Sequence, residues 1–337
     1  MHPASEKTGH APRTVIVGAG AIGGLLAAAL ARAGHTVSVL ARGATLAAIR
    51  EHGIRVAERD GAVPASGLPV LASDSPVELG AQDFVVLALK AQALPSMAAC
   101  LHPLVGPRTA VISAMNGLPW WFLDGIGAWP AGQPIEAVDP SGAVSAVLPA
   151  ASSIGCVVHL SSSTEAPGVI RRGRGNRLII GAARATLEPT AHAFARGLEA
   201  GGFDVERSSD IRSEIWAKLW GNMNMNPLSA LTGSTADRLL DDPLTHELVL
   251  RMMEEADAIG RRLGLSTGMS AQARVTVTRE LGAFKTSMLQ DLEAGRPLEI
   301  DPILGVFPEL GRKLGVPTPF CDAVLGLLRQ RAANSGL

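Results

Sequence analysis

Hydrophobic positions follow two different periods along the chain, and the change falls near Ser208. Before it, short apolar runs alternate with helical stretches, which is typical of strands buried on both faces of a sheet. The runs that predict strands are 14–17, 35–40, 83–89, 110–114, 154–160, 168–170 and 177–180, with a last edge strand at 203–205. Beyond Ser208 the period is almost wholly helical. The pattern predicts an α/β fold, with a doubly wound sheet followed by an all-helical C-terminal domain.

The same pattern divides the chain into three parts. Residues 1–12 carry no apolar segment, so we expect a flexible tail rather than a secretory signal. Residues 13–207 form the predicted sheet domain, and residues 208–337 form the helical domain. Within the sheet domain, residues 119–153 are rich in proline, glycine and tryptophan, which predicts an ordered inserted segment. Its tryptophans are Trp120, Trp121 and Trp129. The segment could line the cleft between the domains or form a dimer surface.

A polar ladder runs along one predicted helix, residues 211–233. Lys218, Asn222 and Asn226 stand at successive fourth positions, so they share one face of the helix. Bulky apolar residues flank the ladder, namely Ile215, Trp216, Leu219, Trp220, Met223 and Met225. In one interpretation, Lys218 lies on a solvated stripe and the asparagines cap or turn the chain before Pro227. In the other, the helix is buried and its lysine has a partner and a task.

A glycine-rich turn follows the first predicted strand and opens a helix at 24–32. Its residues are Gly18, Ala19, Gly20, Ala21, Ile22 and Gly23, which form the dinucleotide fingerprint in a strand–turn–helix context. Gly18 is expected to make the tight turn, Gly20 to let the backbone approach a pyrophosphate, and Gly23 to allow close helix packing. The free amides of the helix N-terminus suit phosphates. We therefore predict an N-terminal Rossmann-type domain that binds its cofactor through these six residues.

The end of the second predicted strand indicates which dinucleotide is bound. Sites for NAD place a carboxylate there to accept from the ribose 2'-hydroxyl, whereas this chain has Leu40-Ala41-Arg42-Gly43. The guanidinium of Arg42 suits a 2'-phosphate. The sequence thus predicts NADPH, unless Arg42 is only an exposed arginine at a strand end.

Two further strand ends carry polar side chains. Strand 83–89 runs into Lys90, and strand 110–114 is followed by Met115-Asn116-Gly117. Ligands of open α/β sheets bind beyond the carboxyl ends of the strands. We therefore expect Lys90 and Asn116 to face the nicotinamide end of the cofactor, although each alone could be a turn residue.

Composition narrows the range of partners. The chain of 337 residues is 47% hydrophobic and 18% charged with a net charge of -1, which favours neither nucleic acid nor an anionic membrane. Its apolar runs are too short to span a bilayer. Cys100, Cys156 and Cys321 match no metal-ligand or redox spacing. We expect reduced core thiols, no metal site, and a cytoplasmic protein with a small-molecule partner.

A second polar cluster lies within residues 285–301 of the helical half. Ser287 opens the run SMLQD, and Glu299 stands shortly before Asp301-Pro302. That dipeptide predicts a helix N-cap followed by proline at the first helical position. Taken singly, Ser287 could be an ordinary helix serine and Glu299 an exposed carboxylate.

In this order, the motifs GAGAIGG, LALKAQ, AMNG, KLWGNMNMNPLSALTG and SMLQDLEAGRPLEID resemble those of the ketopantoate reductases, or 2-dehydropantoate 2-reductases. The last two motifs are specific to that family, and the resemblance covers nearly all of the chain. It implies an oxidoreductase with an NADP-binding Rossmann-like domain, a helical domain and an active site in the cleft between them. The reaction expected from it is NADPH-dependent reduction of ketopantoate to pantoate in pantothenate biosynthesis, by a monomer or homodimer.

The resemblance also implies roles for the polar residues. Lys218 is the general acid, and Glu299 binds near the reacting oxygen. Asn222 and Asn226 hold the substrate, and Ser287 binds its carboxylate. The residues that frame the nicotinamide and substrate or read the 2'-phosphate are Lys90, Asn116 and Arg42. Physically, an ammonium can stabilise charge on the keto oxygen and supply a proton if a carboxylate offsets its burial, and Glu299 is the expected partner.

Several alternatives stay open at this point. A further asparagine of the family is absent from Leu231–Ala236, and segment 119–153 is longer than the compact family pattern needs, so the substrate could be another 2-keto acid. A β-hydroxyacid or opine-type dehydrogenase shares the two-domain layout, but the KxxxNxxxN ladder argues against it. A non-catalytic NADPH-binding sensor is the third alternative, and it would not need Lys218.

Overall fold

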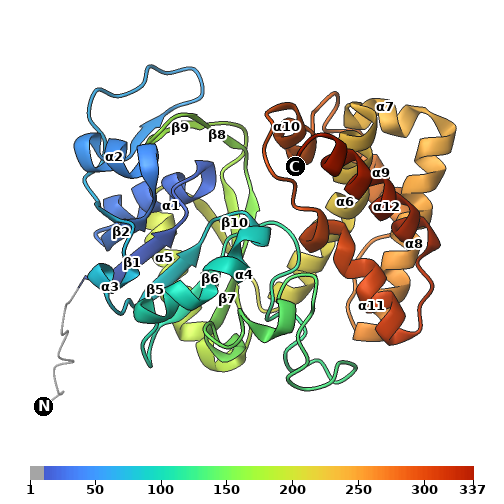
Figure 1. Cartoon of the computed structure of the whole chain (residues 1–337), viewed down its shortest axis with the longest axis horizontal. Helices are drawn as coiled ribbons and strands as arrows, with labels where there is room; N and C mark the ends of the chain where they lie inside the picture. Colours follow the sequence, from blue (N-terminus) through green and yellow to red (C-terminus); the bar gives the residue numbers. More distant parts are fainter. Residues whose placement is uncertain (1–10) are drawn as a thin grey trace, which may run out of the picture.

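The computed structural model describes residues 11–337 and has an α/β half followed by a helical half, as predicted (Figure 1). The predicted tail of residues 1–12 lies outside the described residues except for its last two positions. Helix α6 (Ile211–Thr232) begins beside the sheet and runs into the helical half, so it belongs to the surroundings of both.

A mixed sheet of eight strands forms the first half. Its order is β11-β10-β7-β6-β5-β1-β2-β4, and every neighbouring pair is parallel except β7 and β10. The strands are β1 (Arg13–Val17), β2 (Thr36–Leu40), β4 (Leu71–Ser73), β5 (Phe84–Leu87), β6 (Ala110–Ser113), β7 (Ser153–His159), β10 (Arg177–Ala182) and β11 (Asp204–Arg207). The last strand lies at the edge of the sheet, as its position at the end of the α/β pattern predicted.

Both faces of this sheet are covered, because successive strand residues point to opposite sides and nearly all are apolar. Ile16 and Val86 pack in the core that includes α1 (Ala21–Arg32) and α5 (Glu188–Ala200). Val15 and Val85 pack on the other face. The remaining elements of this half are α2 (Gly43–His52), α3 (Pro76–Leu79), α4 (Leu94–Met97) and 3-10 turns at Ala91–Ala93, Ala98–Leu104, Pro140–Gly142, Ala150–Ser152 and Ala185–Leu187.

A small second sheet, which the sequence did not predict, lies beside α1. It contains β3 (Arg55–Ala57), β9 (Val169–Arg172) and β8 (Ser162–Ala166), in that order. Ile170 of β9 packs so closely on Gly24 of α1 that a Cβ built there would lie 2.6 Å from its Cγ1. Two of these strands are short or polar, so their pattern carried too little signal for a separate sheet.

The helical half is built around α6. The other helices are α7 (Ala236–Asp241), α8 (Pro243–Leu263), α9 (Ala271–Arg279), α10 (Ser287–Glu293), α11 (Val306–Leu314) and α12 (Pro319–Asn334). Helix α6 begins at the N-cap Asp210 and ends at Gly233, which has left-handed backbone angles. It continues through Pro227, so the interpretation in which the asparagines end the helix before that proline is wrong.

The predicted helix start at Asp301-Pro302 is displaced by one residue. Ile300 is the capping residue, and Asp301–Gly305 form a π-helical turn that leads into α11. The Asp301 side chain instead accepts a hydrogen bond from Arg329 of α12 at 2.6 Å. The proline still lies in the first turn, where its missing N–H is tolerated.

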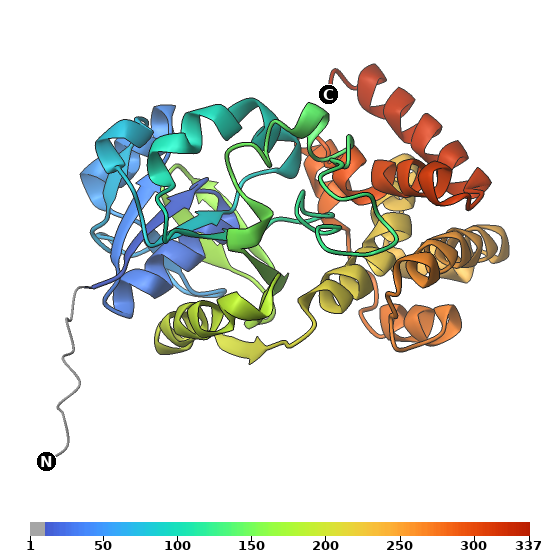
Figure 2. The same ribbon diagram turned by 90° about the horizontal axis from the view of Figure 1, so that it is seen from below.

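The tryptophan-rich segment 119–153 connects β6 to β7 and reaches across to the helices (Figure 2). Its tryptophans are buried, and each indole donates to an acceptor of the sheet half: Leu148 O, Ser113 Oγ and Gln133 O for Trp120, Trp121 and Trp129. The indoles therefore form neither a cleft wall nor an exposed dimer surface. They belong to the hydrophobic core.

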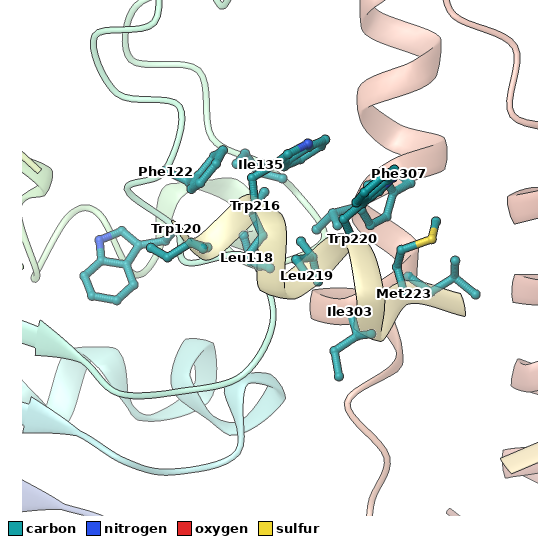
Figure 3. Close-up of a cluster of buried hydrophobic side chains, with 14 of the residues drawn as sticks. Leu118, Trp120, Phe122, Ile135, Trp216, Leu219, Trp220, Met223, Ile303 and Phe307 are labelled. Carbon is teal, nitrogen blue, oxygen red and sulfur yellow. The ribbon is translucent and has the colours of Figure 1, made fainter. Parts of the chain in front are cut away.

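That core joins the two halves through an aromatic row (Figure 3). The ring of Trp216 on α6 stacks at 6.0 Å from Phe122 of segment 119–153 and lies 5.3 Å from Phe307 of α11. Outside the apolar contacts, the carboxylate of Glu309 accepts from the backbone N–H groups of Glu136 and Ala137 at 2.9 and 2.8 Å. Segment 119–153 thus packs between the sheet and the helices.

Candidate active site

A narrow cavity opens where the ends of β6 and β7 meet α6. Its lining comes from both halves: Ser113, Met115, Asn116, Gly117, Leu118, Pro119, Cys156 and Val157 from the sheet side, and Ile215, Lys218, Leu219 and Asn222 from α6. The cavity lies at the carboxyl end of the parallel strands, where ligands of such sheets bind. Two members of the polar ladder, Lys218 and Asn222, face it together with the strand-end residue Asn116.

Lys218 is half-buried and holds two acceptors from the sheet half. Its Nζ donates to Asn116 Oδ1 at 3.0 Å and to the carbonyl oxygen of Val158 at 2.8 Å. An ammonium has three donors, so one N–H is left for a ligand in the cavity. Because the ammonium only donates, Asn116 presents its oxygen to it and keeps its NH₂ group available. The ladder is therefore part of a polar site and not a solvated stripe.

Burial lowers the pKa of Lys218 to about 8, an effect that nearby Cys156 and Glu299 partly oppose. Lys218 is therefore mostly protonated at pH 7, but it releases its proton more readily than an ordinary lysine. The thiol of Cys156 lies against the same cavity, and burial raises its pKa to about 12. This cysteine is a neutral wall of the cavity rather than a nucleophile.

Glu299 makes its direct contacts with other groups than Lys218, although its charge opposes the effect of burial on that lysine, as expected. Its Oε1 accepts from the backbone N–H of Ala91 at 3.1 Å, and its Oε2 lies 3.5 Å from Lys90 Nζ. Lys90 also makes a short ion pair with Asp291 of α10. The lysine that belongs to Glu299 is therefore the one at the end of β5, because the loop after β5 docks on the turn that holds Glu299.

Asp291 was missed by the sequence reasoning, although it stands in the SMLQD motif. It is nearly buried and bridges two cations, Lys90 and Arg296, whose Nε lies 2.8 Å from Asp291 Oδ1. A signal existed, since a carboxylate four residues after Ser287 falls on the same helix face. Its partner Lys90 lies 201 positions away in sequence, and no local pattern could supply it.

Two predicted substrate ligands stand apart from the cavity. Asn226 is buried deeper in α6, and Ser287 is exposed at the first turn of α10; neither lines the cavity. Helix α10 nevertheless packs on α6, so Ser287 stays in the neighbourhood of the ladder. Their roles remain predictions.

The fingerprint turn has a shape that suits a dinucleotide. Gly18 has φ +99°, a left-handed value that favours glycine, and a Cβ at Gly23 would overlap the carbonyl oxygen of Gly18. Above Gly20, the N-cap of α1, no atom lies within 4 Å of a Cβ position. The turn therefore leaves open space at a helix N-terminus without a side-chain cap, and a pyrophosphate fits such a site.

Arg42 follows β2, which is the neighbour of β1 in the sheet. It is the N-cap residue of α2. Its side chain is exposed, and Nη2 donates a hydrogen bond to the sulfur of Met97 at 3.8 Å. No ion pair engages Arg42 within residues 11–337. The strands that carry Lys90, the fingerprint and Arg42 are neighbours in the order β5-β1-β2, so these residues lie along one edge of the sheet.

Comparison with known proteins gives the family. The model described as "Ketopantoate reductase PanE/ApbA" matches residues 14–121, and that described as "Ketopantoate reductase PanE/ApbA C terminal" matches residues 210–332. The chain belongs to the ketopantoate reductase family. The family predicted from the motifs is thereby confirmed.

Close relatives extend over the whole chain. A 2-dehydropantoate 2-reductase of Mesorhizobium japonicum is 45% identical over 96% of this chain and 99% of its own length. The crystal structure of a putative ketopantoate reductase from Ralstonia solanacearum MolK2 is 49% identical and has a TM-score of 0.90, covering 97% of this chain and 100% of its own. A D-mandelate dehydrogenase solved with NADH and anilino(oxo)acetate, at 20% identity and TM-score 0.80 over 96% and 99%, shares the fold.

The expectations about membrane spans, metal ligands and cysteines concern residues that the structure describes. Between residues 11 and 337, no helix is both long and apolar enough to span a bilayer, and no group of three or more His, Cys, Asp or Glu is arranged to hold a metal ion. Cys156 and Cys321 are buried free thiols, as predicted. Cys100 is exposed, so the expectation of a core position was wrong for that residue.

Proposed function

We propose that this chain reduces 2-dehydropantoate to pantoate with NADPH. The observation that carries this proposal is a half-buried lysine with two asparagines around one cavity, in a chain 45% identical over 96% of its length to a 2-dehydropantoate 2-reductase. A ligand in this cavity meets Lys218, Asn116 and Asn222 on one side and apolar side chains on the other.

Lys218 is proposed as the general acid. Its third N–H points a proton at the keto oxygen, whose growing negative charge the ammonium stabilises. Asn116 holds the ammonium through its oxygen and can donate its NH₂ to the substrate, as can Asn222. Asn226 and Ser287 are retained as supporting substrate residues from the family resemblance.

The residues at the sheet edge fit the cofactor. The turn from Gly18 to Gly23 would hold the pyrophosphate, and exposed Arg42 would bind the 2'-phosphate. When bound, NADPH supplies the hydride. Glu299 is proposed to position the site by holding Lys90 and the N–H of Ala91, while its charge also helps to keep Lys218 protonated.

We also propose that residues 13–207 form the NADP-binding unit and residues 208–337 the substrate unit. β11 ends at Arg207 and α6 starts at Ile211, and the cavity is lined by side chains from both sides of this junction. In this proposal the active site is complete only when the two units are packed together.

The first test is NADPH oxidation with a panel of 2-keto acids, in the wild type and in Lys218→Ala. We expect 2-dehydropantoate to be the best substrate and the variant to lose about 100-fold or more in kcat, the scale of a general acid. Lys313→Ala is a matched control, because Lys313 lies on α11 outside the cavity lining. Wild-type turnover in Lys218→Ala would exclude the mechanism.

The pH profile gives a second prediction. Lys218 must be protonated to act as an acid, and its pKa is about 8. We expect kcat/KM for keto acid reduction to fall tenfold per pH unit above this value, measured by steady-state kinetics with NADPH saturating. A profile flat from pH 7 to 10 would contradict the assignment.

Cofactor preference tests Arg42. Removing its side chain in Arg42→Ala should cut the preference for NADPH over NADH by about 10- to 100-fold, since a charge-assisted contact contributes about 1.5–3 kcal/mol. The ratio of the two kcat/KM values measures this effect directly. Arg50→Ala on the same helix is a control, because Arg50 donates to Ala72 O instead. An unchanged ratio would remove Arg42 from the site.

A second candidate is a 2-keto acid with a wholly apolar side chain. Most of the cavity lining beyond the three polar residues is apolar, including Met115, Val157 and Leu219. The substrate panel decides between the two, because a pocket of this kind discriminates methylenes by about 10- to 200-fold at most.

A further inference from the structure

The loop after β6, which carries Asn116, packs directly against the backbone of the helical half. The N–H of Leu118 donates to the carbonyl oxygen of Pro302 at 2.9 Å. Gly117, between Asn116 and Leu118, has φ +84°, and a Cβ built on it would lie 2.6 Å from Pro302 Cβ and 2.7 Å from its oxygen. Only glycine permits so close an approach with this backbone conformation, so the residue type at position 117 allows the contact.

A local change of helical period makes Pro302 available for this contact. In an α-helix the N–H of Val306 would donate to the carbonyl oxygen of Pro302, four residues before it. In the π-helical turn Asp301–Gly305, that N–H donates to Asp301 O instead. The carbonyl oxygen of Pro302 is thereby released from this bond and accepts from Leu118 of the sheet half. The π-helical turn, an element often found at functional sites, here joins the two halves.

The residues just before Pro302 hold a second strand-end loop. The carboxylate of Glu299 accepts from the N–H of Ala91 at 3.1 Å and lies 3.5 Å from Lys90 Nζ. Both residues follow β5, which is the neighbour of β6 in the sheet. Residues 299–302, called the docking turn below, thus contact the loops after two neighbouring strands. One short segment of the helical half sets the position of both loops.

The placement of Asn116 depends on this contact. Its Oδ1 accepts from Lys218 Nζ at 3.0 Å, so the hydrogen bond crosses from the sheet half to α6. A displacement of the loop by about 1 Å would take this pair beyond hydrogen-bond distance. In enzymes, a misplacement of this size that originates away from the reacting atoms can lower the rate by about 100-fold.

We propose that Gly117 is a positioning residue of the active site: it lets the loop after β6 pack on the docking turn, which sets Asn116 against the ammonium of Lys218. The inference deepens the proposed reductase function and rests on it. Gly117 acts through Asn116 and takes no part in the transfer of the proton or the hydride.

Gly117→Ala tests the proposal by displacing the loop from the docking turn. We expect kcat for 2-dehydropantoate to fall about 10- to 100-fold, the scale of a misplacement of about 1 Å. Gly125→Ala is the matched control, because Gly125 has φ +79° and nothing lies within 4 Å of its Cβ position. It carries similar backbone strain without the collision, so its kcat should stay within about twofold of wild type. Equal losses in the two variants would overturn the proposal.

A double variant shows whether the effect passes through Asn116. In Asn116→Ala the side chain that Gly117 positions is already absent, so adding Gly117→Ala should lower kcat by no more than about a further threefold. Substitutions at residues that act through one another are not additive. Losses that multiply would contradict the proposal, because Gly117 would then act independently of Asn116.

The pH profile is a readout that a general loss of packing would not move. The hydrogen bond to Asn116 favours the charged form of Lys218, so its loss should lower the pKa of Lys218 below its value of about 8. The decline of kcat/KM on the basic side should therefore begin at lower pH in Gly117→Ala. A decline at the wild-type pH would overturn the proposal.

The titratable groups that face Lys218 are Cys156 and His159 of β7 and Glu299 of the docking turn. Burial raises the pKa of Cys156 to about 12. Burial, and then nearby cations that include Lys218, lower the pKa of His159 to about 4. All three groups are present in the wild type and in the variant, so a displaced decline reports the lost bond to Asn116.

Pro302→Gly reaches the same contact from the helical half and adds no atom, so it carries the test if Gly117→Ala does not fold. The substitution removes the Cβ that Gly117 packs against and loosens the backbone of the docking turn. We expect kcat to fall about 3- to 10-fold, with the basic decline again at lower pH. Wild-type kcat together with a wild-type pH profile in Pro302→Gly would overturn the proposal.

Urea unfolding separates this proposal from the reductase function, because it needs no turnover. With a lower pKa of Lys218 in the folded state, the free energy of unfolding of Gly117→Ala should begin to rise at lower pH than that of the wild type. If this shift appears and no keto acid of the panel is reduced, the positioning contact stands and the reductase function fails. If keto acids are reduced without the shift, the reductase function stands and the positioning role fails. Absence of both excludes both proposals.

Discussion

At the scale of single residues, this site depends on how each polar group is satisfied. Lys218 has two acceptors and one remaining donor, whereas both carboxylate oxygens of Glu299 are engaged by Lys90 and the N–H of Ala91. The sequence could indicate the lysine, because it stands in a periodic ladder. It could not indicate the ion pair of Lys90 with Asp291, because the two residues lie 201 positions apart in the sequence.

The buried lysine should make stability depend on pH. The pKa of Lys218 is about 8 in the folded chain and about 10.4 when unfolded, so the unfolded state binds more protons between these values. Its burial penalty is complete below pH 8 and disappears toward pH 10.5. Lys218→Met should therefore gain free energy of unfolding relative to wild type at pH 7, by about 3 kcal/mol at most, and the gain should vanish as the pH rises.

Urea titrations of both proteins from pH 7 to 10 measure this difference. The two hydrogen bonds lost in Lys218→Met shift the difference by a constant and leave its slope with pH unchanged. A difference that does not fall between pH 8 and 10 would mean that the pKa of Lys218 is not lowered.

At the scale of elements, the sequence predicted most strands and helices, and its errors have physical causes. β11 and α6 were found within a few residues because strong apolar periods and clear end signals coincide there. The start of α11 was displaced, since a π-helical turn carries no side-chain signal that differs from an α-helix. The direct contact between Glu299 and Lys90 was not predicted, because strand-end loops dock by tertiary contacts and not by spacing.

The fingerprint turn gives a prediction at this scale. In Gly23→Ala the new methyl group would overlap the carbonyl oxygen of Gly18, so α1 must shift away from β1. Overpacking of this kind destabilises a protein by about 1–3 kcal/mol and here should also weaken NADPH binding. Urea unfolding and fluorescence titration with NADPH measure the two effects. Gly127→Ala, where nothing lies within 4 Å of the Cβ position and φ is not positive, is a steric control in the same unit.

At the scale of the whole molecule, segment 119–153 decides how the two halves are joined. Composition predicted that it is ordered, and its buried indoles agree. Its placement between sheet and helices could not be predicted, because tryptophans at a cleft, an interface or a core have the same sequence signature. The proposed boundary at residue 208 therefore divides the sequence into two parts, whereas residues from both parts share one hydrophobic core.

Trp216 is the central contact of this junction and allows a quantitative test. It is 1% exposed, so Trp216→Ala should lower the free energy of unfolding by about 3–5 kcal/mol. Phe320→Ala is the matched control, because Phe320 is 41% exposed and its loss should change stability by about 0.5 kcal/mol or less. Both values come from urea titration with circular dichroism. Equal effects of the two substitutions would show that the aromatic row does not stabilise the junction.

The aromatic row also determines how this enzyme could be recombined with its relatives. A chimera cut at residue 208 would present Trp216 and Phe307 to a foreign loop and leave Phe122 against a foreign helix. The contacts of the parent protein are kept only if residues 119–153 and residues 208–337 of a chimera come from the same parent. The unit of exchange is thus discontinuous in the gene, because it joins the helical half to a piece of the sheet half.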